Sequence, residues 1–352
     1  MKRLGLVGLA AIASVLALRT DVVRAQRPVR APLEVYFIDV EGGAATLMVT
    51  PNRESVLVDC GWPGLGDRDP KRIEHVARYV LGLERIDHFV ATHWHTDHYG
   101  GIEGLAKRIP IGTYWDHGVP ETLADDPRGY QTLISAYRRA NGGKSRALKP
   151  GDRIPLRDAG MPVELRVVAG GGKVIGEGDT AGPMSCARHR DAPVKDESDN
   201  MRSLALHLRY GKFDFLNCGD LTWNIEHKLA CPQNRVGKVD LWQVTHHGAP
   251  QSGNPALVEA IEPRCAIICN GPRKGGDPRT FATLKKTRSL EGIFQLHRNV
   301  TSTPMDNAKT THIANPEEKC RGEFLRMTLD PSGERYSVAV GGQMPTQTFA
   351  VR

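Results

Sequence analysis

The stretch that most constrains the fold of this chain is T-H-W-H-T-D-H-Y-G-G at residues 92–101, which directly follows a short, continuous apolar run. His93 and His95 are two residues apart, so an extended backbone would point both imidazoles to the same side. Asp97 and His98 follow at once, which places four ligand-type side chains within six positions. Imidazoles and carboxylates crowded at the end of a buried strand indicate a metal site.

The pattern on either side of this motif alternates between strands and helices. Short apolar and alternating runs predict strands, and apolar residues at helical spacing predict helices, the first with Asp69 as its N-cap residue before Pro70. The strands are expected at residues 33–40, 45–49, 55–58, 86–92, 163–168, 203–208, 213–218, 241–245 and 266–269, and the helices at 69–81, 132–139 and 255–261. This order predicts an α/β fold whose two strand-rich halves are compatible with two facing sheets.

The first 25 residues have the pattern of a secretory signal peptide. A basic start is followed by an uncharged apolar run of 15 residues and then by V-R-A, after which cleavage is expected. The run is shorter than the ~20 residues that span a bilayer, and no later apolar run approaches that length. We therefore expect a secreted or periplasmic bacterial protein without stable membrane insertion, in which residues 26–32 form a linker.

Charge and cysteine content limit the function classes only weakly. Four basic residues and one acidic residue lie in the predicted signal peptide, so the net charge falls from +7 to +4, too little to indicate a nucleic-acid partner on its own. The cysteine count is odd, and no C-x-x-C pair is present, so a cysteine-based zinc site is not expected. The cysteines in loop-like surroundings, which could bridge, are Cys186, Cys231 and Cys320, and those expected in the core are Cys60, Cys218, Cys265 and Cys269.

Two further motifs could complete a metal site. Asp220 lies in N-C-G-D-L, just after one predicted strand, and His246 and His247 lie in T-H-H-G, just after another. The carboxyl ends of strands are where α/β proteins build their sites. The two oxygens of one aspartate can bridge two cations, and either histidine can complete the second site.

Taken in order, Asp59 in V-L-V-D-C-G, the T-H-W-H-T-D-H-Y-G-G motif, G-D-L and T-H-H-G resemble the metallo-β-lactamase superfamily of metal-dependent hydrolases, over about Leu33 to Asn299. The segments L-E-V-Y-F-I-D-V-E-G-G-A-A-T-L and D-N-M-R-S-L-A-L-H-L-R-Y-G-K-F-D-F-L-N-C-G-D-L resemble most the hydrolase domain of ComEC-type competence proteins. The resemblance implies a four-layer αββα sandwich with loop insertions and a metal pair at one edge. We expect this domain at residues 33–300, with a C-terminal β extension at 301–352, packed on it, whose D-P-S-G turn makes a hairpin.

The resemblance also implies a role for each motif residue. His93 and His95 would bind the first metal, Asp97 and His98 the second, and Asp220 would bridge the two. His247 would close the second site, while His246 would contact the substrate or the transition state; the sequence leaves open which of the two is the ligand. Asp59 would orient the histidine segment without binding metal.

The sequence departs from the family pattern at two places. A third histidine of the first site is missing, and Asp199 or Asn200 in D-E-S-D-N-M-R-S would stand in its position. His189, in a long glycine-rich loop at residues 170–199, and His207, expected to face solvent, are the histidine alternatives. The second departure is Ala44, where competence domains usually carry an acidic residue.

The remaining histidines are expected to be less important. His117 follows a predicted strand soon after the metal motif and is a candidate for the pocket wall, together with Asp116. His297 is a weaker candidate for the same role. The other histidines are expected at the surface, and they are His75, His88, His227 and His312.

The expected function is that of a secreted metal-dependent hydrolase. Its cofactors would be two divalent metal ions, zinc first because the ligands are rich in histidine, with manganese or iron as alternatives because carboxylates are also present. A hydroxide bound by the metal pair would cleave a phosphodiester or related ester, with Asp97 or His246 assisting proton transfer. The substrate could be a small molecule or a polymer, nucleic acid included, and basic residues at 138–149 and 273–274 favour an anionic one. The alternatives are a lactam or lactone hydrolase and a non-catalytic metal-binding protein with the same fold.

Overall fold

A computed structural model describes residues 31–178, 184–194 and 196–352 of the chain. The predicted signal peptide and most of the predicted linker lie outside the described residues. Within the described residues the chain forms two nine-stranded sheets. No helix among them is both long enough and apolar enough to cross a membrane.

The first sheet combines the N-terminal third of the chain with its C-terminus. Its order is β18-β17-β16-β1-β2-β3-β4-β5-β6, with antiparallel pairing from β18 to β3 and parallel pairing from β3 to β6. The strands are β1 (Leu33–Phe37), β2 (Thr46–Val49), β3 (Ser55–Val58), β4 (Ile86–Val90), β5 (Ile111–Asp116), β6 (Arg146–Ala147), β16 (Leu325–Leu329), β17 (Arg335–Val340) and β18 (Gln347–Ala350). The predicted C-terminal hairpin is thus β16–β17, and it extends the sheet beyond β1.

The second sheet has the order β15-β14-β13-β12-β11-β10-β8-β7, with β9 also paired to β8. Pairing is parallel from β11 to β15 and antiparallel among the others. The strands are β7 (Arg153–Ile154), β8 (Val163–Gly170), β9 (Lys173–Val174), β10 (Ala205–Tyr210), β11 (Phe213–Asn217), β12 (Leu241–Gln243), β13 (Cys265–Ile268), β14 (Gly292–His297) and β15 (Ile313–Asn315).

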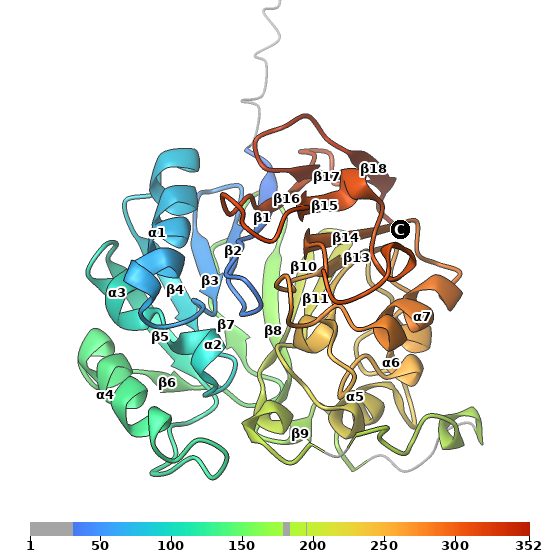
Figure 1. Cartoon of the computed structure of the whole chain (residues 1–352), viewed down its shortest axis with the longest axis horizontal. Coiled ribbons are helices and arrows are strands. Elements are labelled where there is room, and N and C mark those ends of the chain that lie inside the picture. The colour runs from blue at the N-terminus through green and yellow to red at the C-terminus, as the bar shows by residue number, and fades with distance from the viewer. Residues whose placement is uncertain (1–30, 179–183, 195) are drawn as a thin grey trace, which may run out of the picture. The chain divides into compact units, whose positions relative to one another are not determined.

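Helices cover the outer face of each sheet, so that the layers run helix, sheet, sheet, helix (Figure 1). The first sheet is covered by α1 (Arg68–Glu74), the π-helical turn His75–Val80, α2 (Thr96–Tyr99), α3 (Ile102–Ala106) and α4 (Gly129–Asn141). The second is covered by α5 (Trp223–Ala230), α6 (Pro255–Ile261) and α7 (Pro278–Lys286). Short 3-10 turns occur at Leu65–Asp67, Met184–Ala187, Asp199–Arg202, Thr245–Gly248, Pro304–Asp306 and Thr310–His312. The predicted four-layer αββα sandwich is confirmed.

Apolar side chains from both sheets form the central core. Phe37 of β1 packs edge-on against Phe215 of β11 across the sandwich, with ring centres 5.9 Å apart. Further core clusters lie between each sheet and its own helices. The four cysteines expected in the core are all buried. Burial of these strands on both faces explains why their sequences are continuous apolar runs.

The start of the first helix differs from the prediction. Helix α1 begins at Arg68, and its N-cap residue is Asp67, whose side chain makes no capping hydrogen bond. The carboxylate of Asp69 instead turns back and accepts a hydrogen bond of 2.8 Å from the backbone N–H of Trp62. Asp69 therefore holds the loop that precedes the helix, which places Trp62 near the T-H-W-H-T-D-H segment.

Candidate metal centre

The T-H-W-H-T-D-H segment connects the end of β4 to the short helix α2, and Asp59 organises it. Asp59 follows β3 and adopts a positive φ of 61°. Its two oxygens accept hydrogen bonds of 2.8 Å from the backbone N–H of Thr92, from the hydroxyl of Thr92 and from Nδ1 of His98. Asp59 thus orients the segment from behind, in the manner that the family resemblance implies.

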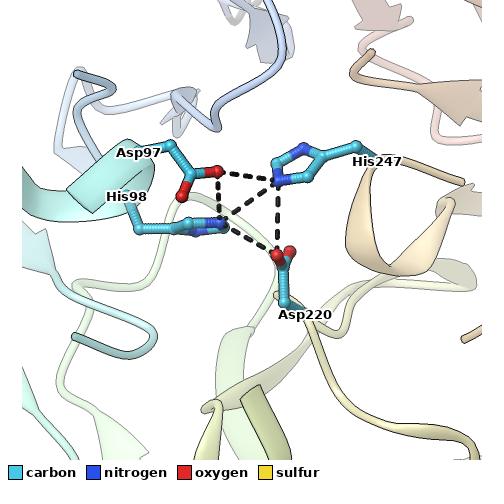
Figure 2. Close-up of side chains that lie close together, drawn as sticks. All are labelled: Asp97, His98, Asp220 and His247. Carbon is cyan, nitrogen blue, oxygen red and sulfur yellow. Dashed lines mark hydrogen bonds and ion pairs between the residues drawn. The ribbon is translucent and has the colours of Figure 1, made fainter. Parts of the chain in front are cut away.

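Four side chains from three distant segments converge in a buried cluster, which Figure 2 shows. The Nε2 atoms of His98 and His247 lie 3.2 Å apart. Asp97 Oδ2 lies 3.3 Å from His98 Nε2 and 3.2 Å from His247 Nε2. Asp220 Oδ2 lies 3.2 Å and 3.3 Å from the same two nitrogens. The structure therefore brings together the predicted second-metal residues, the predicted bridging aspartate and His247 of the histidine pair.

Both histidines of this cluster are held from outside through their other ring nitrogen. His98 Nδ1 donates to Asp59, and His247 Nδ1 donates to the carbonyl oxygen of Cys269 at 3.0 Å. Such outer hydrogen bonds fix the tautomer of a metal-binding histidine and aim Nε2 at the metal. The turn Thr245–Gly248 that presents His247 is left-handed at His246 and His247, with φ of 54° and 53°. This backbone is unfavourable for residues other than glycine, and such conformations cluster at functional sites.

The electrostatics of the cluster fit a cation. Burial opposes ionisation of Asp97 and Asp220, yet the neighbouring imidazoles, together with the Lys274 ammonium at Asp97, outweigh it and hold the pKa of both carboxyls well below the usual range. Burial likewise disfavours charge on His98 and His247, but the carboxylates raise the pKa of both imidazoles. Two carboxylates and two inward-facing imidazole nitrogens in a buried space are the donor set of a divalent metal site, in which the cation replaces the imidazole protons.

His246 lies at the edge of the cluster. Its Nε2 is 3.4 Å from Asp220 Oδ2, and its Nδ1 is 3.2 Å from the hydroxyl of Ser252, which donates in turn to the carbonyl of Leu221 at 2.6 Å. Burial, as the main cause, lowers the pKa of His246. The side chain is 11% exposed, whereas that of His247 is 2% exposed. His246 is therefore the histidine of the pair that a bound molecule can reach.

The predicted first-metal residues are close to the cluster but do not form a closed set. The ring centre of His93 lies 4.1 Å from that of His98, and its buried Nε2 has no hydrogen-bond partner among the described residues. His95, the other predicted first-metal residue, donates from Nε2 to Asp125 Oδ2 at 2.6 Å, so a carboxylate holds this nitrogen. Asp125 was not predicted; it lies in the segment L-A-D-D-P, whose composition is that of an ordinary loop.

The two candidates for the missing third ligand differ in what their oxygens do. Asp199 Oδ2 accepts from the backbone N–H of Trp94 at 2.8 Å and from Nε2 of His117 at 3.0 Å. Asn200 donates through Nδ2 to Asp196 at 3.0 Å, while its buried Oδ1 has no hydrogen-bond partner in the part of the chain that the structure describes. Asp199 thus supports the metal segment, together with His117, and Asn200 is the candidate with an oxygen available.

Several other histidines lie in places that the sequence did not predict. His207 is buried and donates to Asp214 at 2.7 Å, so the expectation that it faces solvent is wrong. His88 and His312 are also buried, because they pack on Trp115 and Phe294. The backbone carbonyl of His189 accepts hydrogen bonds from Trp223 and Asn254, on the α5–α6 side of the molecule. The nearby Cys186 forms a disulfide with Cys231, while Cys320 is unpaired.

A second group of ligand-type residues consists of Asp39, His297 and Cys320. His297 Nε2 donates to Asp39 Oδ1 at 2.8 Å, and Cys320 Sγ is 3.8 Å from the same nitrogen. Arg72 donates to the other oxygen of Asp39 at 2.8 Å and to Glu41 at 3.0 Å. Burial alone would lower the pKa of His297, but the hydrogen bond to Asp39 raises it to about 9. The imidazolium and the guanidinium already neutralise the carboxylates of this group.

The sequence of this chain is similar to those of known proteins. Residues 38–187 match the family model of the metallo-beta-lactamase superfamily, and that range contains the whole H-W-H-T-D-H motif. ComE operon protein 3 of Bacillus subtilis is 24% identical over 250 residues, which are 68% of this chain and 28% of that protein. Recombination protein 2 of Haemophilus influenzae is 24% identical over 242 residues, which are 68% of this chain and 24% of that protein. The chain thus spans about a quarter of the length of these two relatives.

Among solved structures, the subclass B3 metallo-β-lactamase MEM-A1 from a soil metagenome library aligns with 76% of this chain and 77% of its own. Its sequence identity to this chain is 15%, and the TM-score is 0.33.

Proposed function

The chain belongs to the metallo-β-lactamase superfamily of metal-dependent hydrolases, and from that premise we propose that it is an exported enzyme that cleaves a phosphodiester with the help of two divalent metal ions. The observation that carries the proposal is the buried cluster of Asp97, His98, Asp220 and His247, whose ligand atoms all lie within 4.8 Å of one another. Clusters of this kind are expensive to bury unless a cation balances them.

Each predicted ligand has a place in the proposed site. Asp97, His98 and His247 would hold one cation, His93 and His95 would hold the other, and Asp220 would be shared. The unpartnered Nε2 of His93 and Oδ1 of Asn200 support a second position beside the first. Zinc is the first choice for this histidine-rich set, and manganese or iron are the alternatives that its carboxylates allow. When bound, such a pair of metal ions lowers the pKa of a water ligand to ~7 and supplies positive charge that stabilises the reacting group.

The residues of the chain itself would orient the reaction and move protons. Asp59 and the Cys269 carbonyl hold the two imidazoles of the cluster, so that ligand positions are set before substrate arrives. Since Nδ1 of His246 donates to Ser252, its Nε2 is the atom that can take up or deliver a proton beside Asp220. Asp97 is the other candidate for this role.

Two features support a phosphodiester as the substrate. The first is the likeness to the competence and recombination proteins over 68% of the chain. The second is the exposed basic stretch around α4, which carries Arg138 and Arg139. Tyr137 of α4 packs against Trp94 of the metal motif with ring centres 5.0 Å apart, and Arg138 and Arg139 lie at exposed positions of the same helix. A positively charged approach favours an anionic polymer.

The disulfide supports export. Cys186–Cys231 joins the loop after β9 to the end of α5, and disulfides persist mainly in oxidising compartments. N-terminal sequencing of the protein from the periplasm or medium should give a chain that begins at Gln26. Recovery of only the uncleaved chain, in the cytoplasm, would contradict export.

The function is tested by metal analysis of the purified mature protein alongside a hydrolysis panel. The panel consists of bis(p-nitrophenyl) phosphate, single-stranded DNA, a lactone and a cephalosporin, each with added zinc or manganese. We expect bound divalent metal and cleavage of the phosphodiesters. Absence of metal, or survival of all four substrates, would contradict the enzyme, and cleavage of the lactone or cephalosporin alone would replace the phosphodiester by those substrates.

A further inference from the structure

We propose that Lys274 forms an anion-binding subsite beside the metal cluster and holds a non-bridging oxygen of the substrate phosphate. The inference rests on the proposed function for the reaction. It goes beyond that function because it names a side chain outside the ligand set that selects a negatively charged group at the reacting centre.

Lys274 reaches the cluster from the loop between β13 and α7. Its ammonium contacts Asp97 Oδ2 and lies 4.9 Å from the ring centre of Trp62. The Lys274 side chain is 41% exposed, while that of Asp97 is 9% exposed. The ammonium therefore lies where the buried cluster meets solvent, and a bound molecule can reach it.

The backbone that carries Lys274 is held tightly against the ligands. Gly276 donates its N–H to the carbonyl of His247 at 2.8 Å, and Gly271 donates to the carbonyl of Lys274 at 2.8 Å. A Cβ atom at Gly275 would come within 2.2 Å of the His247 carbonyl oxygen. The loop can approach so closely only because glycine stands there. The position of Lys274 relative to the cluster is consequently set by the fold, while its long side chain keeps freedom to move.

The Lys274 ammonium packs over the indole ring of Trp62. The backbone N–H of Trp62 is held by Asp69, and its indole Nε1 lies against Gly43, where a Cβ would come within 3.2 Å. An ammonium over the face of an indole is attracted by the negative face of the ring. The indole would thus keep the ammonium near the cluster when Asp97 binds a metal ion in place of Lys274.

Charge decides what the subsite accepts. A divalent ion in the cluster would satisfy Asp97 and repel the ammonium, which then needs a new anionic partner. A phosphodiester oxygen offers a charge-assisted hydrogen bond, whereas the carbonyl of a neutral lactone offers only a weaker one. The neighbouring Arg273 already has an anionic partner, because its guanidinium pairs with Glu318 at 2.6 and 3.1 Å.

The test compares Lys274→Met and Lys274→Arg with Lys212→Met, which removes the same charge from an exposed lysine in the turn between β10 and β11. Calorimetry measures binding of inorganic phosphate, with acetate as the carboxylate control, to the zinc-loaded full chain. Competition with a chelator measures the affinity for zinc. Steady-state kinetics with bis(p-nitrophenyl) phosphate separates KM from kcat.

Lys274→Met should weaken phosphate binding about tenfold and raise KM by a similar factor, since one charge-assisted contact is lost. It should bind zinc at least as tightly as the wild type, because the ammonium no longer competes for Asp97. Lys274→Arg should recover most of the phosphate affinity, and Lys212→Met should match the wild type. Weaker phosphate binding together with undiminished zinc binding is a pattern that a damaged fold does not give.

A change in phosphate affinity of less than about twofold in Lys274→Met would overturn the subsite, as would a parallel loss of zinc and phosphate binding. Acetate binding as tight as phosphate, and equally dependent on Lys274, would replace phosphate by carboxylate. If the wild type hydrolyses no diester but phosphate binding depends on Lys274, the subsite stands and the proposed function fails. If diesters are hydrolysed with the same KM in Lys274→Met, the function stands and the subsite fails.

Discussion

Two groups of histidines and carboxylates lie in this molecule, and they differ in what balances their charge. In the cluster of Asp97, His98, Asp220 and His247, the outer nitrogens of both imidazoles are held by the fold, and the inner ones face two carboxylates. In the described part of the chain, the only lysine or arginine that pairs with these carboxylates is Lys274. Its side chain is 41% exposed, and it contacts one oxygen, Oδ2 of Asp97.

The carboxylates near Asp39, His297 and Cys320 are instead paired with a guanidinium that is much less exposed than Lys274. Arg72, whose side chain is 14% exposed, binds both Asp39 and Glu41, and His297 binds the remaining oxygen of Asp39. In both groups a cation would replace imidazole protons, but in this one it would also have to displace a guanidinium. Ligand-type residues within reach of one another are thus not sufficient for a metal site, and the balance of charge separates a candidate metal centre from an ion-pair network.

The largest effect that tests this contrast is expected from Asp220→Asn. Asp220 Oδ2 lies within 3.4 Å of a ring nitrogen of His98, of His246 and of His247, so loss of its charge removes the centre of the cluster. Hydrolysis should fall on the order of 10³-fold or more, and bound metal should be lost. Asp214→Asn, on the strand β11 that precedes Asp220, is the matched control, and metal content equally low in both variants would contradict the assignment.

His93→Ala sharpens the contrast within the site. Because no described residue hydrogen-bonds the Nε2 of His93, this nitrogen is available to the first metal, and its removal should cost that metal but leave the cluster that holds the second. The metal content should fall from two equivalents to one, and activity should fall roughly 100-fold. His75→Ala, at an exposed position in the π-helical turn His75–Val80, should change neither. Loss of both metals would show that the two positions are not separable.

Asp59→Asn tests the support of His98 from behind. An amide cannot accept the three hydrogen bonds that the Asp59 carboxylate accepts from Thr92 and His98. Loss of such a partner lowers metal affinity by about 10- to 100-fold. Chelator competition measures this change, and an affinity equal to that of the wild type would mean that Asp59 serves the fold alone.

His297→Gln should affect stability and leave metal content unchanged. The folded pKa of His297 is raised to about 9, so its ion pair stabilises the fold fully below about pH 6.5 and is lost as the pH rises through 9. The wild type should lose on the order of 3 kcal/mol of unfolding free energy over that range, and His297→Gln much less. Urea titrations at pH 6.5 and 9.5 measure the difference, and equal losses in both proteins would contradict the ion pair.

The fold and the centre of the site were predictable because their signals are local. Asp59, Asp97, Asp220 and His247 each lie shortly after a predicted strand, and the ends of parallel strands meet at one edge of a sheet. The αββα order follows from the same alternation of strands and helices. Helix α7 was missed although Asp277 and Pro278 repeat the Asp-Pro signal used for the first helix, and here the aspartate does cap the helix.

The contacts that cross the molecule could not be predicted. Asp125 lies in a loop with no motif, and only the folded chain brings it to His95. The pairing of His297 with Asp39 joins residues 258 positions apart, and that of Lys274 with Asp97 joins residues 177 positions apart. Periodicity reports which face of an element is buried, but it does not report which loops meet over that face.

The most direct test of the contrast between the two groups is anomalous diffraction from crystals of the mature protein, recorded at the absorption edge of bound zinc or manganese. We expect one peak among Asp97, His98, Asp220 and His247 and a second peak beside His93, with none at Asp39, His297 and Cys320. A peak at the second group, or no peak at the first, would contradict this expectation.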